Sequence, residues 1–131
     1  MKFRSTKETG DLGEAAAANY FRENGYRIAA RNYRTPHGEI DIIAENREYI
    51  VFAEVKTRNV RCDARYGRPA DAVNRRKRMH LLYAVSHYLH QHPSDKKQRM
   101  DIIEVYKREN GTDCFEIVDI RHIPNAFGAN G

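Results

Sequence analysis

The chain has 131 residues, of which 40% are hydrophobic and 31% are charged, a composition that excludes a disordered polypeptide and fits one folded domain. Its 23 lysine and arginine residues exceed its 18 acidic residues, and this net charge of +5 favours a polyanionic partner such as nucleic acid. The charged first residues argue against a secretory signal, and no apolar run is long enough to span a membrane, so we expect a cytoplasmic protein.

The first predicted element is a helix over residues 10–26. Asp11 suits its N-cap position and Gly25 suits its C-terminal end. A strand is predicted over residues 27–34, and the turn-forming sequence TPHG ends it.

Two strands follow, over residues 40–44 and 49–57, on either side of the polar sequence ENRE. Each strand carries an acid where a strand interior is normally apolar, and the second strand also carries a lysine. These residues are Asp41, Glu54 and Lys56.

The second half of the chain is predicted to contain a loop over residues 59–71, a helix over 71–90, and strands over 99–107 and 114–120. The Asn-Gly pair at residues 110 and 111 is a strong hairpin signal between the last two strands. One side of the helix is apolar and comprises Val73, Leu81, Leu82, Val85 and Leu89.

This order of elements predicts an α/β domain with a mixed central sheet of about five strands flanked by helices. No linker marks a domain boundary, so residues 1–131 are expected to form a single domain. Its ends, at about residues 1–9 and 122–131, are expected to be flexible.

The connection between the two acid-bearing strands sets their register. If it consists of Asn46–Tyr49, Glu45 pairs with Ile50 and Asp41 lies directly opposite Glu54. Cβ atoms of opposed residues are about 4.5–5.5 Å apart, where carboxylates repel unless a proton or a cation lies between them. Since Mg²⁺ binds one or two carboxylates together with waters and phosphate oxygens, the pair predicts a metal site for cutting phosphodiesters.

Lys56 is expected on the same face as Glu54, where it would hold the scissile phosphate or direct the attacking water. The alternative is an edge hairpin whose cross-strand ion pairs, such as Glu39–Lys56, face water. Glu14, on the first helix, has the alternative role of completing a capping box with Asp11.

Asp41 followed by Glu54-Val55-Lys56 resembles the PD-(D/E)xK signature of the restriction-endonuclease-like superfamily, with Ile40 where the signature has proline. Glu14 matches the extra acid of the Holliday-junction-resolvase-like branch of that superfamily. Several blocks between Gly10 and Ile120 resemble, in order, the YraN family of small bacterial proteins. They are GDLGEAAA, GYRIAARNYR, GEIDIIA, VFAEVKTR and GRPADAV.

The resemblance implies a restriction-endonuclease-like fold and a Mg²⁺- or Mn²⁺-dependent nuclease acting on DNA, with branched or single-stranded DNA as candidates. Asp41, Glu54 and the carbonyl of Val55 would bind the metal, Lys56 would orient or activate the attacking water, and Glu14 would support the site. The alternative is a non-catalytic nucleic-acid-binding or adaptor protein on the same fold. Junction resolvases are dimers, and whether this chain forms a homodimer is left open.

Basic residues beyond the Lys56 strand are candidates for phosphate contacts, with an ordinary solvated surface as the alternative. They are Arg58, Arg61, Arg65, Arg68, Arg75 and Lys77. Tyr33 and Tyr66 are candidates for stacking on bases, although packing is the simpler role. Asp101 opens a predicted strand, where an acid either reaches the functional edge of the sheet or, more commonly, faces solvent.

Overall fold

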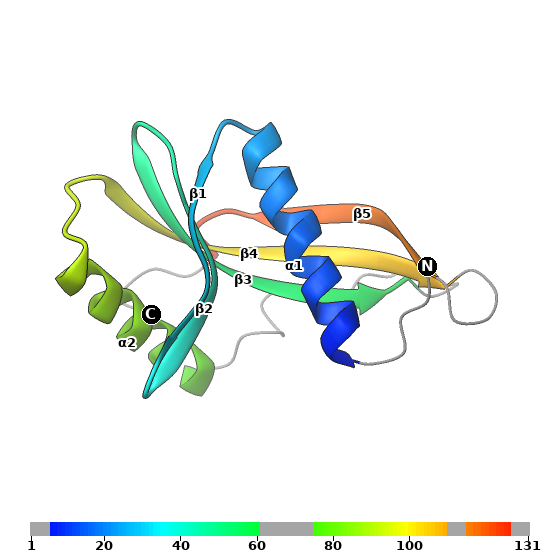
Figure 1. Cartoon of the computed structure of the whole chain (residues 1–131), viewed down its shortest axis with the longest axis horizontal. Coiled ribbons are helices and arrows are strands. Elements are labelled where there is room, and N and C mark those ends of the chain that lie inside the picture. Colours follow the sequence, from blue (N-terminus) through cyan, green and yellow to red (C-terminus); the bar gives the residue numbers. More distant parts are fainter. Residues whose placement is uncertain (1–5, 61–74, 110–114, 127–131) are drawn as a thin grey trace.

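The computed structural model describes residues 6–60, 75–109 and 115–126 of the chain (Figure 1). The predicted α/β class, with a mixed five-stranded sheet flanked by helices, is confirmed. The elements are α1 (Thr6–Glu23), β1 (Arg27–Thr35), β2 (Gly38–Glu45), β3 (Tyr49–Asn59), α2 (Arg75–Gln91), β4 (Lys97–Glu109) and β5 (Phe115–Ile123).

The strands lie in the sheet in chain order, from β1 at one edge to β5 at the other. Neighbouring strands are antiparallel except for β3 and β4, which are parallel. A parallel pair cannot be closed by a tight turn, and α2 lies on the crossover that joins β3 to β4.

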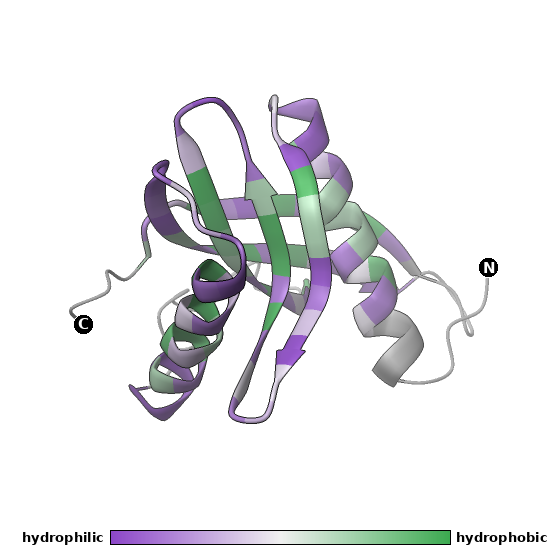
Figure 2. Cartoon of the chain, turned by 60° about the vertical axis from the view of Figure 1, so that its left-hand side comes forward, coloured by the Kyte–Doolittle hydropathy of each residue, from purple (hydrophilic) through white to green (hydrophobic). Residues whose placement is uncertain are grey.

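One helix covers each face of the sheet, because the side chains of the central strands alternate between two apolar clusters. Ile50 and Phe52 point to the α2 side, whereas Val51 and Ala53 point to the α1 side, because successive side chains of a strand point to opposite faces. Figure 2 shows the apolar residues concentrated in the central strands and the polar residues at the turns. On α1, the small residues Ala17 and Ala18 are fully buried against the sheet, together with Phe21.

Two glycines allow helices to approach the sheet more closely than any side chain would permit. A Cβ atom on Gly13 of α1 would lie 2.0 Å from Thr57 Oγ1 of β3. A Cβ atom on Gly38, at the start of β2, would lie 2.0 Å from the carbonyl oxygen of His80 in α2. The two glycines therefore set where each helix meets the central strands.

The predicted register of the β2–β3 hairpin is confirmed, since Glu45 pairs with Ile50. The boundaries of the outer elements differ from prediction. Helix α1 begins at Thr6 and not at the predicted cap Asp11, and β5 continues to Ile123. No helix in the described part of the chain is long and apolar enough to cross a membrane.

Candidate active site

Strands β2 and β3 separate part-way along their length. Their pairing covers Ile42–Glu45 on β2 and Ile50–Ala53 on β3. The earlier residues of β2 pair with β1, and the later residues of β3 pair with β4. In Figure 1, the β1–β2 hairpin bends away while β3 continues beside β4. We call the point of separation the fork, and the first residues beyond the pairing on its two arms are Asp41 and Glu54.

A backbone kink in β1 lies beside the fork. Asn32 falls between Arg31, which pairs with Ile42, and Tyr33, which pairs with Ile40, so its position in the register is opposite Asp41. Its φ angle is 51°, in the left-handed region that asparagine tolerates better than most residues. The kink lets the β1–β2 hairpin turn out of the plane of the sheet at Asp41, where β2 separates from β3.

The Asp41 side chain closes the gap that the fork opens. The Val55 N–H donates a hydrogen bond to Asp41 Oδ2 at 2.8 Å, so a carboxylate accepts the bond that a neighbouring strand would otherwise accept. Burial, followed by the charge of Glu54, raises the pKa of Asp41 from 3.8 to about 8, against the lowering effect of this hydrogen bond. Two carboxylates therefore meet at the fork, and without a cation one of them holds a proton near neutral pH.

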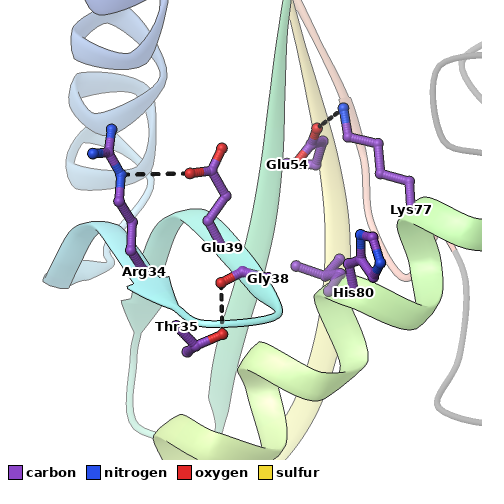
Figure 3. A pocket seen from close by; sticks show the side chains of 8 residues that line it. Arg34, Thr35, Gly38, Glu39, Glu54, Lys77 and His80 are labelled. Carbon is purple, nitrogen blue, oxygen red and sulfur yellow. Dashed lines mark hydrogen bonds and ion pairs between the residues drawn. The ribbon is translucent and has the colours of Figure 1, made fainter.

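Glu54 is buried on β3 and lies between two lysines. Its Oε1 atom is 2.8 Å from Lys77 Nζ and 3.7 Å from Lys56 Nζ. Burial and the neighbouring Lys77 lower the pKa of Lys56. Burial acts in the same direction on Lys77, but its hydrogen bonds with Glu54 and Lys56 outweigh it and raise its pKa. Figure 3 shows Lys77 reaching from the first turn of α2 to Glu54.

Lys77 was predicted from sequence as a phosphate contact, and the structure places it in the carboxylate cluster. Nothing local marks this role, because Lys77 stands among four consecutive basic residues at the start of α2. The strand register brings Asp41 and Glu54 together, but it says nothing about Lys77. Lys77 lies on α2, which is separated from β3 by a long connection in the sequence.

Glu14 lies on α1 beside the same site. It lines a hollow of about 450 Å³ together with Asn32, Glu39 and Asp41. Its Oε1 atom is buried and accepts no hydrogen bond from the residues that the structure describes. Burial raises the pKa of Glu14, opposed by the Arg31 charge and a hydrogen bond with Asn32. Its acidic group thus faces the Asp41 side of the fork.

The capping-box explanation of Glu14 does not hold. A capping box needs its first residue at the N-cap, but Asp11 lies inside α1, which begins five residues earlier at Thr6. The close approach of Gly13 to Thr57, one residue after Lys56, instead brings the Glu14 turn of the helix to the arm of β3 that carries the site.

A second hollow, of about 330 Å³, opens on the α2 side and is lined by Glu54 and Lys77. Arg34 and Glu39 line both hollows and form an ion pair with Arg34 Nε 3.5 Å from Glu39 Oε2 (Figure 3). Glu39 therefore pairs with Arg34, and the sequence-based interpretation of Glu39 as the partner of Lys56 is wrong.

The other candidates for nucleic-acid contact are less closely grouped. Arg58 lies further along β3, where its Nε atom is 2.9 Å from Oε2 of the buried Glu104. Arg75 is exposed at the first position of α2. Three arginines and one tyrosine from the prediction lie outside the described residues, namely Arg61, Arg65, Arg68 and Tyr66.

The donor set at the fork suits a hard cation of the Mg²⁺ or Mn²⁺ type. Two carboxylate side chains meet there, and the Val55 carbonyl leaves β3 on the same side as the N–H that Asp41 binds. Mg²⁺ is commonly held by one or two carboxylates and completed by waters and phosphate oxygens. In the described part of the chain, no three His, Cys, Asp or Glu side chains are grouped so that they could hold a metal ion by themselves.

Comparison with known proteins places the chain in a family. The model of a family described as "Uncharacterised protein family UPF0102" matches residues 13–105, which include all the residues at the fork. The chain belongs to the UPF0102 family. This confirms the resemblance to the YraN family.

Several relatives in UPF0102 match along nearly their whole length. A UPF0102 protein of Acetivibrio thermocellus is 41% identical over 123 residues, covering 92% of each chain. One from Symbiobacterium thermophilum is 41% identical over 125 residues, covering 95% of this chain and 99% of the relative. One from Clostridium acetobutylicum is 38% identical, covering 95% and 97%. The fork therefore lies within a domain that these relatives share almost entirely.

Proposed function

We propose that the chain is a divalent-metal-dependent nuclease that hydrolyses phosphodiester bonds in DNA, with Mg²⁺ or Mn²⁺ as its cofactor. The observation that carries the proposal is the meeting of Asp41 and Glu54 at the fork, with Lys56 beside them. Repulsion between the two carboxylates is relieved when a divalent cation replaces the proton that Asp41 otherwise holds. The likeness of these residues to the PD-(D/E)xK signature of restriction-endonuclease-like enzymes supports the same assignment.

Each residue at the fork has a distinct part in the proposed reaction. Asp41 and Glu54 would hold the metal ion through their carboxylates, and the Val55 carbonyl would add a neutral ligand. The bound ion supplies Lewis-acid chemistry to the phosphate and the attacking water. Lys56 lies next to Glu54 and has a lowered pKa, which suits it to orient the water, exchange its proton and offset charge on the phosphate.

Glu14 and Lys77 support this reaction from the two helices. Glu14 lines the hollow that Asp41 also lines, which places its carboxyl group to support the metal site through a water. Lys77 neutralises Glu54 before the metal binds. With a metal ion on Glu54, the same ammonium group would be available to a phosphate oxygen.

A cleavage assay tests the proposal. Purified protein is incubated with labelled single-stranded, duplex, flap and four-way DNA in Mg²⁺, Mn²⁺ or chelator. We expect cleavage that requires metal and is lost in Asp41→Ala, Glu54→Ala and Lys56→Ala. Glu14→Gln should lower the rate less, because Glu14 acts through water. Cleavage that survives the Asp41 or Lys56 substitution would assign the activity to another site or to a contaminant.

The alternative function is a nucleic-acid-binding adaptor without catalysis. It is favoured if the wild-type protein cuts none of the substrates while its DNA binding persists in chelator. Dimerisation belongs to the same test, since paired cuts in a four-way junction need two sites. Sedimentation with and without junction DNA distinguishes a dimeric resolvase from a monomer that cuts single strands.

A further inference from the structure

Two large apolar side chains are exposed side by side on α2. Among the described residues, the exposed large hydrophobic side chains are Met79, Tyr83 and Ile117, with 62%, 42% and 37% of their surface accessible. Met79 and Tyr83 are four residues apart and therefore neighbours on one side of the helix. Leu81 and Val85 already bury the opposite side in the core, so packing within the domain does not explain the exposed pair.

Tyr83 contacts the rings of two histidines. His37, from the turn between β1 and β2, meets it edge-on with ring centroids 5.0 Å apart at 88°. His87, one turn further along α2, stacks on it at 6.3 Å and 28°. His87 is itself fixed, because its Nδ1 atom is 2.7 Å from the Tyr33 hydroxyl oxygen. We call His37, Tyr83, His87 and Tyr33 the aromatic ladder.

The aromatic ladder begins beside the hollow that contains Glu54. Gly38, the residue after His37, lies against the backbone of His80, and both line that hollow (Figure 3). Lys77 enters the same hollow from α2. Tyr83 is six residues beyond Lys77 on the helix, a rise of about 9 Å. At about 3.4 Å per stacked nucleotide, this axial rise spans about three nucleotides, and fewer in an extended strand.

The surroundings of the aromatic ladder are cationic. Helix α2 contains no aspartate or glutamate, and its first four residues are Arg75, Arg76, Lys77 and Arg78. Across the hollow, Arg34 has a side chain that is 75% exposed and pairs with Glu39, so the excess of positive charge comes from α2. An occupant must therefore combine negative charge with flat apolar faces. Nucleic acid with unpaired bases meets both requirements, whereas a duplex keeps its base faces stacked on one another.

We propose that the aromatic ladder is a base-stacking surface for single-stranded nucleic acid, and that an unpaired base near the scissile phosphate lies on Tyr83. The position of that base relative to cleavage rests on the proposed nuclease function, whereas the stacking does not. It implies that single-stranded or flap DNA is bound more tightly than duplex of the same length, because only unpaired bases reach the ring.

The chain offers a direct optical test of stacking, because it contains no tryptophan. Tyr83→Trp introduces a single indole whose emission is quenched when a base stacks on it. The titration uses oligothymidine and an abasic oligomer of equal length, both in chelator so that no cleavage occurs. We expect quenching by oligothymidine and little quenching by the abasic oligomer.

Binding affinities complete the test. Base stacking on an aromatic side chain contributes about 1–3 kcal/mol, so Tyr83→Ala should weaken oligothymidine binding by about 5- to 150-fold while leaving abasic binding unchanged. Tyr83→Phe should bind like the wild type, and Ile117→Ala, which changes an exposed apolar residue on β5, serves as the control. Equal loss for both oligomers, or no loss for either, would overturn the proposal.

Further outcomes separate this inference from the proposed function. If polyglutamate competes as well as oligothymidine for the ladder, the occupant is an acidic peptide and the proposal fails. If the stacking signal is present but no substrate is cut in Mg²⁺ or Mn²⁺, the ladder stands and the nuclease proposal fails. If cleavage is intact, Tyr83→Ala binds oligothymidine like the wild type and oligothymidine does not quench the emission of Tyr83→Trp, the reverse holds.

Discussion

At the scale of single residues, the raised pKa of Asp41 links stability to pH. The folded chain holds a proton on Asp41 up to about pH 8, whereas the unfolded chain releases it near 3.8. The free energy of unfolding should therefore fall as pH rises through this window. Asp41→Asn places a neutral side chain there and removes the free-energy cost of keeping Asp41 protonated. We expect the variant to be more stable than the wild type by about 1–3 kcal/mol at pH 8, with a smaller difference at pH 5.

Urea denaturation in chelator at both pH values measures this difference. Asp95→Asn, which changes an exposed aspartate after α2, is the matched control and should show no such trend. The stability gain of Asp41→Asn over the wild type should grow from pH 5 to pH 8. If that gain stays constant or shrinks, the buried proton does not belong to Asp41.

The proposed metal ion would compete with Lys77 for Glu54. Its Nζ atom lies 2.8 Å from Glu54 Oε1, and its positive charge repels a cation bound there. Removing that charge in Lys77→Met should tighten Mn²⁺ binding by about 3- to 10-fold, since two charges a few ångströms apart near a protein surface interact by about 1 kcal/mol or more.

Calorimetric titration with Mn²⁺ in the absence of DNA checks this prediction. Lys77→Arg keeps the charge and should bind Mn²⁺ like the wild type, and Lys97→Met removes an exposed lysine of β4 as a further control. Weaker Mn²⁺ binding in Lys77→Met would mean that Lys77 supports the metal site and does not oppose it.

At the scale of elements, the glycine contacts position both helices. Gly38→Ala would drive a Cβ atom into the His80 backbone carbonyl, and Gly13→Ala would drive one into the Thr57 side chain. Each should destabilise the fold by about 1–3 kcal/mol, with Gly38→Ala the more costly because backbone cannot move aside as a side chain can.

Thermal unfolding of a small variant set tests these contacts. Gly10→Ala is the control, because nothing lies within 4 Å of the added Cβ atom. Alanine is also the better helix former, so this variant should be neutral or slightly stabilised. Combining Gly13→Ala with Thr57→Ala should recover part of the loss, since Thr57 Oγ1 is the atom struck. Strict additivity of the two losses would argue that α1 does not rest on Thr57.

At the scale of the whole molecule, the net charge of +5 predicts salt-dependent binding of DNA. For duplex DNA, log affinity falls linearly with log salt concentration, and each phosphate contact makes the slope more negative by about 0.9. We expect a slope of about −3 to −5, and Arg75→Ala should reduce its magnitude by about 1. Fluorescence anisotropy between 50 and 200 mM salt provides the measurement, and a flat profile would favour a protein partner.

The sequence predicts the central hairpin well because the information is local. Asp41 and Glu54 each lie in an apolar strand, and four residues separate the paired residues Glu45 and Ile50. This short connection fixes the register in which Asp41 and Glu54 meet. Lys77 is different, because its place depends on how α2 crosses the sheet, which no nearby pattern records. Gly13 and Gly38 likewise give no signal for close approach until the partner element is known.

Asp101 shows how a boundary error changes the interpretation of a residue. The sequence places Asp101 near the start of a strand, where an acid reaches a functional edge or faces solvent. In the structure β4 begins earlier, at Lys97, and Asp101 is fully buried. Its carboxylate accepts hydrogen bonds from Arg99 at 2.9 Å and from the Asn125 N–H at 2.8 Å, and it contacts His122 Nε2 at 2.6 Å. Arg99 lies two residues away on the same strand, but Asn125 and His122 meet Asp101 only in the tertiary structure.

The central claim is that Asp41 and Glu54 together bind a divalent cation at the fork. Anomalous diffraction from crystals grown with Mn²⁺ locates the ion directly. We predict a peak within coordination distance of both carboxylates and the Val55 carbonyl, with Lys77 displaced from Glu54, and no peak there in Asp41→Asn crystals. A Mn²⁺ peak elsewhere on the chain, with Lys77 still bound to Glu54, would contradict the account.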